Sequence, residues 1–140
     1  MSSTRATFCD SRETYEAAIR SIFSGPPETT EADLSKIFHP NLTQRDNDTT
    51  RDFPAFVKHI RWVREVTNGN IGQVDVVQFI RDGSQLAERH IGKGKFPDGT
   101  PVESETLMFV DVAEDGRIEK VVELVKRIVH KNGGTESIPI

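Results

Sequence analysis

The spacing of hydrophobic residues changes from a helical period to a strand period about halfway along the chain. Between residues 10 and 27, apolar side chains recur three and four positions apart, which predicts a helix with one buried face. Asp10 and Glu13 form a capping box at its start, and Gly25, followed by two prolines, ends it. The apolar positions of this helix are Tyr15, Ala18, Ile19, Ile22 and Phe23.

Two further helices and a short strand complete the first half. Residues 29–38 and 51–70 have helical spacing, and residues 42–47 between them predict a short strand. Asp52 is placed to cap the third helix. The predicted buried stripe of that helix is Phe53, Phe56, Val57, Ile60, Val63 and Thr67.

From residue 71 the apolar residues alternate, which predicts β-strands. The connections carry the turn sequences DG, PDGT and EDG, so the strands are expected to form an antiparallel meander. One face of such a sheet must pack on the helices, so we expect an α+β fold with a curved sheet and a pocket at its mouth. The four predicted strands are residues 71–81, 84–94, 102–112 and 116–129.

The composition indicates one soluble domain. A chain of 140 residues fits a single domain, residues 1–140, with a folded core of about 11–129 and a flexible tail over 130–140. The net charge of −4 argues against a nucleic-acid partner, and no apolar run has the length of a membrane span. A single cysteine, Cys9, and the absence of an apolar signal segment lead us to expect a reducing, cytoplasmic location.

The order of elements and the local sequence of the second half resemble a known group of proteins. The stretch "LAERHIGKGKFPDGTPVESETLMFVDVAEDGRIEKVVEL" contains a strand, a glycine-containing crossing, a second strand, a "D-G-[KR]-I" turn at residues 115–118 and a final strand. Over residues 11–129 the chain resembles the SnoaL-like group of the nuclear transport factor 2-like superfamily. The segment "VVELVKR" is similar to short fungal SnoaL-like proteins of polyketide, meroterpenoid and indole-alkaloid pathways.

This resemblance implies a cone-shaped α+β barrel, which in the family is often a homodimer through the sheet. It also implies cofactor-free chemistry, because its members include cyclases, isomerases, dehydratases and hydrolases, alongside proteins without catalysis. In SnoaL-type cyclases an acidic residue on the last strand does acid–base work. Alignment on the turn at 115–118 places Lys126 at that position, so the chain departs from the family pattern there.

The last strand nevertheless carries a carboxylate among valines, at Glu123. Glu123 shares one strand face with Val121 and Val125, whereas Lys126 lies on the other. Two interpretations stay open: an ion pair at a dimer face, or a cavity carboxylate with a raised pKa that moves a proton near neutral pH.

Several other residues are candidates for the site. His90 is a candidate proton shuttle, which Glu88 on the same strand face would orient. Arg45, in the predicted short strand, is placed to stabilise an oxyanion. We predict catalytic roles for Glu123, His90 and Arg45. The residues predicted to contact substrate are Asp75, Gln78, Glu88, His59, Phe56 and Phe109.

The resulting hypothesis is an enzyme that acts on a small hydrophobic substrate by proton transfer, as an isomerase or cyclase of secondary metabolism. The four histidines lack metal-ligand spacing, so no metal and no cofactor are expected. Three alternatives stay open: a dehydratase, a hydrolase that adds water to an epoxide through Asp75, Arg45 and Asp46, and a non-catalytic binding or dimerisation module.

Overall fold

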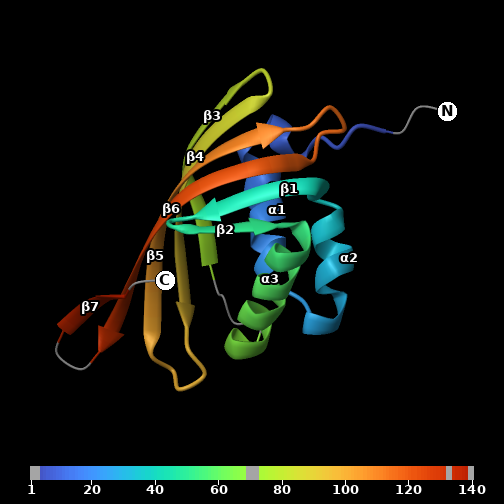
Figure 1. Cartoon of the computed structure of the whole chain (residues 1–140). Coiled ribbons are helices and arrows are strands. Elements are labelled where there is room, and N and C mark those ends of the chain that lie inside the picture. The colour runs from blue at the N-terminus through green and yellow to red at the C-terminus, as the bar shows by residue number, and fades with distance from the viewer. Residues whose placement is uncertain (1–3, 69–72, 132–133, 139–140) are drawn as a thin grey trace.

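The computed structural model describes residues 4–68, 73–131 and 134–138, of which residues 129–131 and 134–138 are described by backbone alone. Helices are concentrated in the first half and strands in the second, as the period of the sequence predicts (Figure 1). The helices are α1 (Arg12–Phe23), α2 (Thr30–Ser35) and α3 (Phe53–Thr67), with short 3₁₀ turns at Phe8–Asp10 and Pro27–Thr29. The strands are β1 (Phe38–Asp46), β2 (Thr49–Asp52), β3 (Gln73–Asp82), β4 (Gln85–Lys95), β5 (Pro101–Val112), β6 (Ile118–Lys131) and β7 (Gly134–Ile138).

The strands form one curved, mixed sheet in the order β2-β1-β6-β5-β4-β3, with β7 paired to β6. The antiparallel meander from β3 to β6 confirms the prediction from the turn sequences. Strand β1 pairs with β6 in parallel and so joins the meander at its β6 edge. The helices lie against one face of this sheet and leave the other face open (Figure 1). The α+β class and the cone-like shape are therefore as expected.

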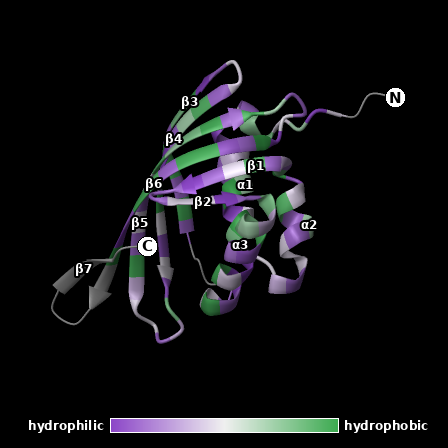
Figure 2. Cartoon of the chain, viewed as in Figure 1, coloured by the Kyte–Doolittle hydropathy of each residue, from purple (hydrophilic) through white to green (hydrophobic). Residues whose placement is uncertain are grey.

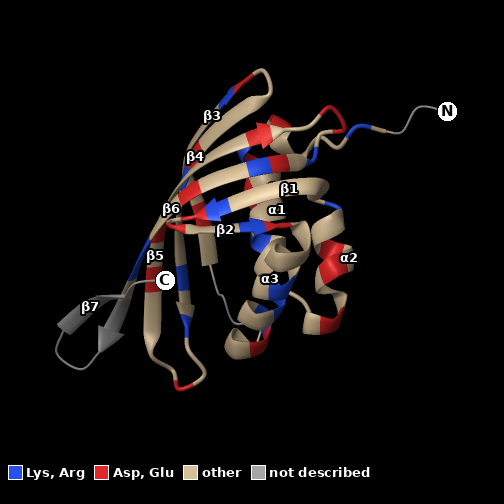
Figure 3. Ribbon diagram, in the orientation of Figure 1, with Lys and Arg blue, Asp and Glu red and all other residues tan. Residues whose placement is uncertain are grey.

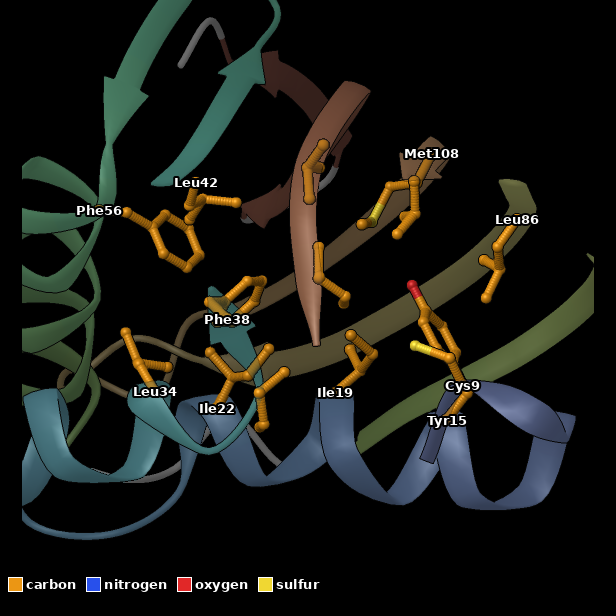
Figure 4. Packing of buried hydrophobic residues seen from close by; sticks show 14 of the residues in the cluster. Cys9, Tyr15, Ile19, Ile22, Leu34, Phe38, Leu42, Phe56, Leu86 and Met108 are labelled. Carbon is orange, nitrogen blue, oxygen red and sulfur yellow. The ribbon is translucent and has the colours of Figure 1, made fainter. Parts of the chain in front are cut away.

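The core lies between α1, α3 and the inner face of the sheet (Figure 4). Side chains of α1 point toward those of the strands, and the strands alternate hydrophobic and hydrophilic residues (Figure 2). Tyr15, Leu34, Leu42, Leu86 and Ile118 are among the residues that are fully buried there. Burial of such apolar surface is the main driving force for this packing.

Local sequence explains where the helices begin, with one difference from the prediction. Ser11 caps α1 by accepting a hydrogen bond from the Thr14 amide, and Asp10 instead pairs with Arg5 and Arg81. Asp52 caps α3 as predicted, because its Oδ1 accepts a 3.0 Å hydrogen bond from the amide of Ala55.

Two features of the fold were not expected. Arg64, within α3, is completely buried and donates hydrogen bonds to Ile22 O, Pro26 O and Asp33 Oδ2, which ties α3 to the end of α1 and to α2. The segment predicted as a flexible tail contains β7, which pairs antiparallel with β6 over residues 134–138. The hairpin formed by β6 and β7 extends the sheet beyond the helices (Figure 1).

Candidate active site

A cavity of about 520 Å³ lies between the inner face of the sheet and helices α1 and α3. Its lining is mostly apolar, with Phe56, Ile60 and Val63 on the α3 side and Val74, Met108 and Val121 on the sheet side. Trp62 and Phe96, both partly exposed, stand at its rim. A cavity of this size holds a small organic molecule.

Glu123 projects into this cavity from β6. Val121, Glu123, Val125 and Arg127 all line it, whereas Leu124 on the opposite face is 55% exposed. The strand face that carries the carboxylate is therefore the inner one, and the lysine at position 126 points outward. Burial, with a further contribution from the negative charge of Asp46, raises the pKa of the Glu123 carboxyl to about 7.

A short hydrogen-bond chain fixes the position of Glu123. Gln44 Nε2 donates a 2.9 Å hydrogen bond to Glu123 Oε1, and Arg51 Nη1 donates to Gln44 Oε1 at 3.2 Å. Because a guanidinium can only donate, Arg51 sets the orientation of the Gln44 amide so that its nitrogen faces Glu123. Gln44 and Arg51 occupy paired positions of β1 and β2.

Asp46 is the second carboxylate at this wall of the cavity. It lies opposite Glu123 in the parallel pairing of β1 with β6 and is only 4% exposed. Its Oδ2 is 3.7 Å from Arg51 Nη1, and its Oδ1 has no hydrogen-bond partner within the described residues. A buried carboxylate oxygen without a partner is costly, and a ligand or water in the cavity can satisfy it.

His90 enters the cavity from β4. Its Nδ1 lies 2.8 Å from Oε1 and 3.0 Å from Oε2 of Glu88, which is itself buried. An ionised Glu88 can only accept, so the proton is placed on Nδ1 and Nε2 is left as the free ring nitrogen. Tyr15 lies close by, and burial together with the charge of Glu88 raises the pKa of its hydroxyl.

The sheet places His90 and Glu123 on the same face, two strands apart. Thr106 of β5 lies between His90 and Val125, and Met108 lies between Glu88 and Glu123. Since neighbouring strands are about 4.8 Å apart, the two backbones are roughly 10 Å apart, and Thr106 and Met108 face the cavity between them.

Arg45 does not reach the cavity, which corrects the prediction for this residue. It follows Gln44 in β1, so its side chain points to the opposite face, where its Nε donates to Asn47 O. Phe109 likewise does not line the cavity, because it lies on the outer face of β5 and is 72% exposed.

A β-bulge explains why Asp75 and Gln78 both lie outside the cavity. Strict alternation would put them on opposite faces, but the pairing of β3 with β4 shifts register between Val76 and Gln78. Asp75 then pairs with Arg20 at 3.2 Å, and Gln78 accepts a hydrogen bond from Arg89. The predicted contact of these two residues with substrate is therefore wrong.

The remaining predicted residues line or adjoin the cavity. Phe56 and His59 line the cavity from α3, and burial lowers the pKa of the His59 imidazole. Glu88 contacts His90 and lies behind it. The catalytic roles predicted for Glu123 and His90 stay predictions, but the structure brings both into one cavity.

Sequence reasoning missed Gln44 and Arg127 at this wall and Arg51 behind Gln44, and it named Asp46 only for the hydrolase alternative. The alternation of β1 contains the signal, because Leu42 is buried and residues 44 and 46 share its face. Arg127 shares the face of Glu123 for the same reason. The pairing of β2 with β1, which brings Arg51 to Gln44, has no comparable signal in the sequence.

Within the described part of the chain, no group of three or more histidine, cysteine or acidic side chains is arranged to hold a metal ion. In the same residues, no helix combines the length and the apolar character needed to cross a membrane.

Comparisons with known proteins identify the fold. A scan against protein-family models and a search of curated proteins found no match. IdmH from Streptomyces antibioticus, a proposed polyketide cyclase, superposes with a TM-score of 0.62 at 16% identity, over 78% of this chain and 87% of that chain. A proposed isomerase of the SnoaL-like family from Agrobacterium tumefaciens has a TM-score of 0.54 at 15% identity, over 81% of this chain and 96% of that chain.

The same fold also occurs without a natural function. The de novo designed NTF2 fold protein NT-9 superposes with a TM-score of 0.56 at 16% identity, over 86% of this chain and 88% of that chain. The chain therefore has the nuclear transport factor 2-like fold, which natural proteins and designed ones share. The fold alone does not define an activity, so the function must be argued from the residues of the cavity.

Proposed function

We propose that this protein is a cofactor-independent isomerase or cyclase that moves a proton on a hydrophobic substrate. The observation that carries the proposal is the convergence of Glu123 and the Glu88-bound His90 on one apolar cavity. A carboxyl with a pKa of about 7 exchanges its proton readily near neutral pH. The fold it shares with a proposed polyketide cyclase and a proposed isomerase supports the same reaction class.

The proposed step is an enolisation. Nε2 of neutral His90 takes a proton from a carbon next to a substrate carbonyl, and the electron pair moves onto the carbonyl oxygen. Protonated Glu123 donates its proton to that oxygen or to another carbon of the conjugated system. Glu88 stabilises the imidazolium that forms, and the apolar walls exclude most water. Water at the rim returns both groups to their starting protonation states.

The reaction class is tested by hydrogen–deuterium exchange of an apolar ketone. The protein is incubated with 2-tetralone in D₂O, and loss of the α-proton signals is followed by NMR. We expect the protein to accelerate exchange over buffer, and Glu123→Gln to lower that acceleration by roughly 10²–10⁴-fold. Glu114→Gln, which removes an exposed carboxylate from the β5–β6 turn, is the control. Undiminished exchange by Glu123→Gln would contradict the assignment.

The substrate proposed is an intermediate of secondary metabolism, of polyketide, terpenoid or alkaloid type, and the location proposed is the cytoplasm. The resemblance of the last strand to short fungal SnoaL-like proteins supports this origin. Deleting the gene in the source organism should lead to accumulation of the substrate, which purified protein should then convert without added cofactor. Failure of the purified protein to consume the accumulated compound would exclude it as substrate.

A second candidate function is addition or removal of water, as in an epoxide hydrolase or a dehydratase. The observation that favours it is the unpartnered Oδ1 of Asp46, beside Glu123, at the cavity wall. Asp46 would activate water and protonated Glu123 would protonate the leaving or opening oxygen. The mass of the product separates the functions, because addition of water raises it by one water molecule, removal lowers it by one, and isomerisation leaves it unchanged.

We also propose that the protein is a homodimer through the outer face of the sheet. That face exposes Ile80, Leu107, Phe109 and Leu124, which are 49–72% exposed. Three strands, β3, β5 and β6, contribute to it, and apolar side chains of this number are rarely left open to water in one patch. The family resemblance implies the same mode of association.

A further inference from the structure

Arg127 is a cation of the cavity with no partner among the residues whose side chains the structure describes. It lies on the inner face of β6, four residues after Glu123, and opposite Ser104 of β5. Among the residues whose side chains are described, it makes no hydrogen bond and no ion pair, whereas the other guanidinium of the site, Arg51, contacts Gln44 and Asp46. Burial lowers the pKa of Arg127, but a guanidinium stays protonated in proteins.

The acids near Arg127 do not balance its charge. Asp46 is already paired with Arg51, at 3.7 Å. Glu123 has a pKa of about 7, so it is partly protonated at neutral pH. A positive charge is therefore left at an apolar cavity. Such a charge is costly unless a partner of opposite sign is present, and a ligand can supply that partner.

The rim of the cavity carries the same sign of charge. Lys93 and Lys95 line it from the end of β4, next to the hairpin that leads to β5 (Figure 3). Both lysines are exposed, while the whole chain has a net charge of −4. Lys93 lies on the outer face, one residue after Gly92 and opposite Glu103 of β5, so the two lysines add only a weak long-range attraction for anionic ligands.

We propose that Arg127 binds a carboxylate of the substrate, so that the substrate is an apolar acid whose charged end lies at β6. The apolar body then packs against Phe56, Ile60 and Val63, between His90 and Glu123. This inference rests on the proposed function, and it adds the substrate class and a specificity-determining residue. Two parallel hydrogen bonds from a planar guanidinium fix a carboxylate in position as well as binding it.

The test compares two ligands of equal shape and different charge. 2-Naphthoate and 2-naphthamide share one apolar ring system and differ in the carboxylate. Their binding is measured by isothermal titration calorimetry with the full chain at pH 6 and low salt, where Glu123 is mostly protonated and the naphthoate is still ionised. We expect wild type to bind the naphthoate more tightly than the amide.

Arg127→Met removes the charge and keeps a side chain of similar length. We expect it to bind the naphthoate about tenfold or more weakly than wild type and to bind the amide equally well. Lys126→Met is the matched control, because it makes the same change one residue earlier on the outer face. It should bind both ligands as wild type does. Thermal unfolding of both variants verifies that they are folded.

The result that overturns the inference is a wild-type protein that binds the amide as well as the naphthoate, or binds neither. An equal loss of both ligands in Arg127→Met overturns it as well, because that pattern indicates a packing role. The measurement needs no turnover, so it can fail while exchange of 2-tetralone succeeds. Conversely, loss of the exchange reaction with intact charge preference rejects the proposed function alone.

Discussion

Gln44 and Glu123 lie on neighbouring parallel strands, and Nε2 of Gln44 donates a 2.9 Å hydrogen bond to Oε1 of Glu123. This bond opposes the effects of burial and of Asp46, because it stabilises the ionised carboxylate and so lowers the pKa of Glu123. The amide thus adjusts the pH at which Glu123 changes from acid to base. Arg51, which orients the amide, acts on Glu123 through Gln44.

Gln44→Leu should raise the pKa of Glu123, because the hydrogen bond to the ionised form is lost. The change is measured by following the side-chain carbonyl carbon of Glu123 by ¹³C NMR as a function of pH, and by the pH dependence of α-proton exchange. The midpoint of the NMR titration and the midpoint of the pH dependence of exchange should both move to higher pH. Thr43→Val, on the outward-facing side of the same strand, is the control and should leave the midpoints in place. A downward shift would mean that the bond has been misassigned.

Glu123 should make the protein less stable as the pH rises. Folding raises the pKa of its carboxyl from an ordinary 4.5 to about 7, so the folded state binds the proton more tightly. The stabilising contribution is complete below pH 4.5 and is lost as the pH rises through 7, by at most about 3 kcal/mol. Glu123→Gln stays neutral, so its stability relative to wild type should increase from pH 4.5 to 8 in urea-unfolding experiments. If the difference in unfolding free energy between Glu123→Gln and wild type does not change with pH, Glu123 is solvated in the folded protein.

Gly92 leaves space that Ser104 occupies. A Cβ added at Gly92 would lie 2.6 Å from Ser104 Oγ, and both residues line the cavity. Gly92→Ala should therefore destabilise the protein by about 1–2 kcal/mol in chemical unfolding, since overpacking forces side chains to move. Ser104→Ala in the same chain should recover most of that loss. If the double variant is no better than Gly92→Ala, the contact with Ser104 is not the cause.

Arg64 should be one of the most sensitive positions of the helical layer. Arg64→Met removes the buried donor of five acceptors, which are Ser21 O, Ile22 O, Pro26 O, Thr30 Oγ1 and Asp33 Oδ2. We expect a loss of roughly 3–5 kcal/mol in urea unfolding, because an unpaired buried group carries its full desolvation cost. Arg61 lies about one helical turn before Arg64 in α3 and is less buried. Arg61→Met should therefore change stability by less than about 1 kcal/mol.

Phe109→Asp should produce a monomer if the outer face is the dimer interface. The side chain is 72% exposed in the single chain and lies at the centre of the apolar face. A charge there is unfavourable in an interface and harmless on a free surface. Sedimentation velocity measures the assembly state. Phe96→Asp, which changes a residue at the cavity rim, is the control and should stay dimeric. A monomeric wild-type protein would contradict the proposed homodimer.

The sequence was sufficient to predict the three helices, the strand β1 and the meander of β3 to β6, but it left open which face of β6 lines the cavity. Alternation of apolar residues in the last strand places Glu123 with Val121 and Val125, and the turn sequences predict the meander, as the structure has them. Alternation also groups His90 with Leu86 and Glu88, and the structure places that face inside. Both signals are local, so a single sequence contains them.

The errors come from features that depend on pairing between distant segments. The bulge at Val76–Gln78 changes the parity of β3, and nothing in the residues of β3 alone marks it. The prediction for Arg45 rests on its charge, because a cation stabilises an oxyanion. The apolar residue Leu42 indicates instead that the buried face of β1 is the one with Gln44 and Asp46. Arg64 was missed because its partners come from α1 and α2, so its burial is a tertiary effect.

Asn47, directly after β1, marks the point at which the strand paired with this edge of β6 changes from β1 to β7. It has a positive φ of 51°, and its side-chain amide forms two hydrogen bonds with the backbone of Val125 in the place of a further strand residue. Beyond that point β7 is the neighbour of β6, from Arg127 onward. The proposed acid is thus held by the N-terminal half of the chain and the proposed carboxylate-binding arginine by the C-terminal hairpin. Sequence changes in that hairpin can alter which substrates bind while the proton-transfer group keeps its place.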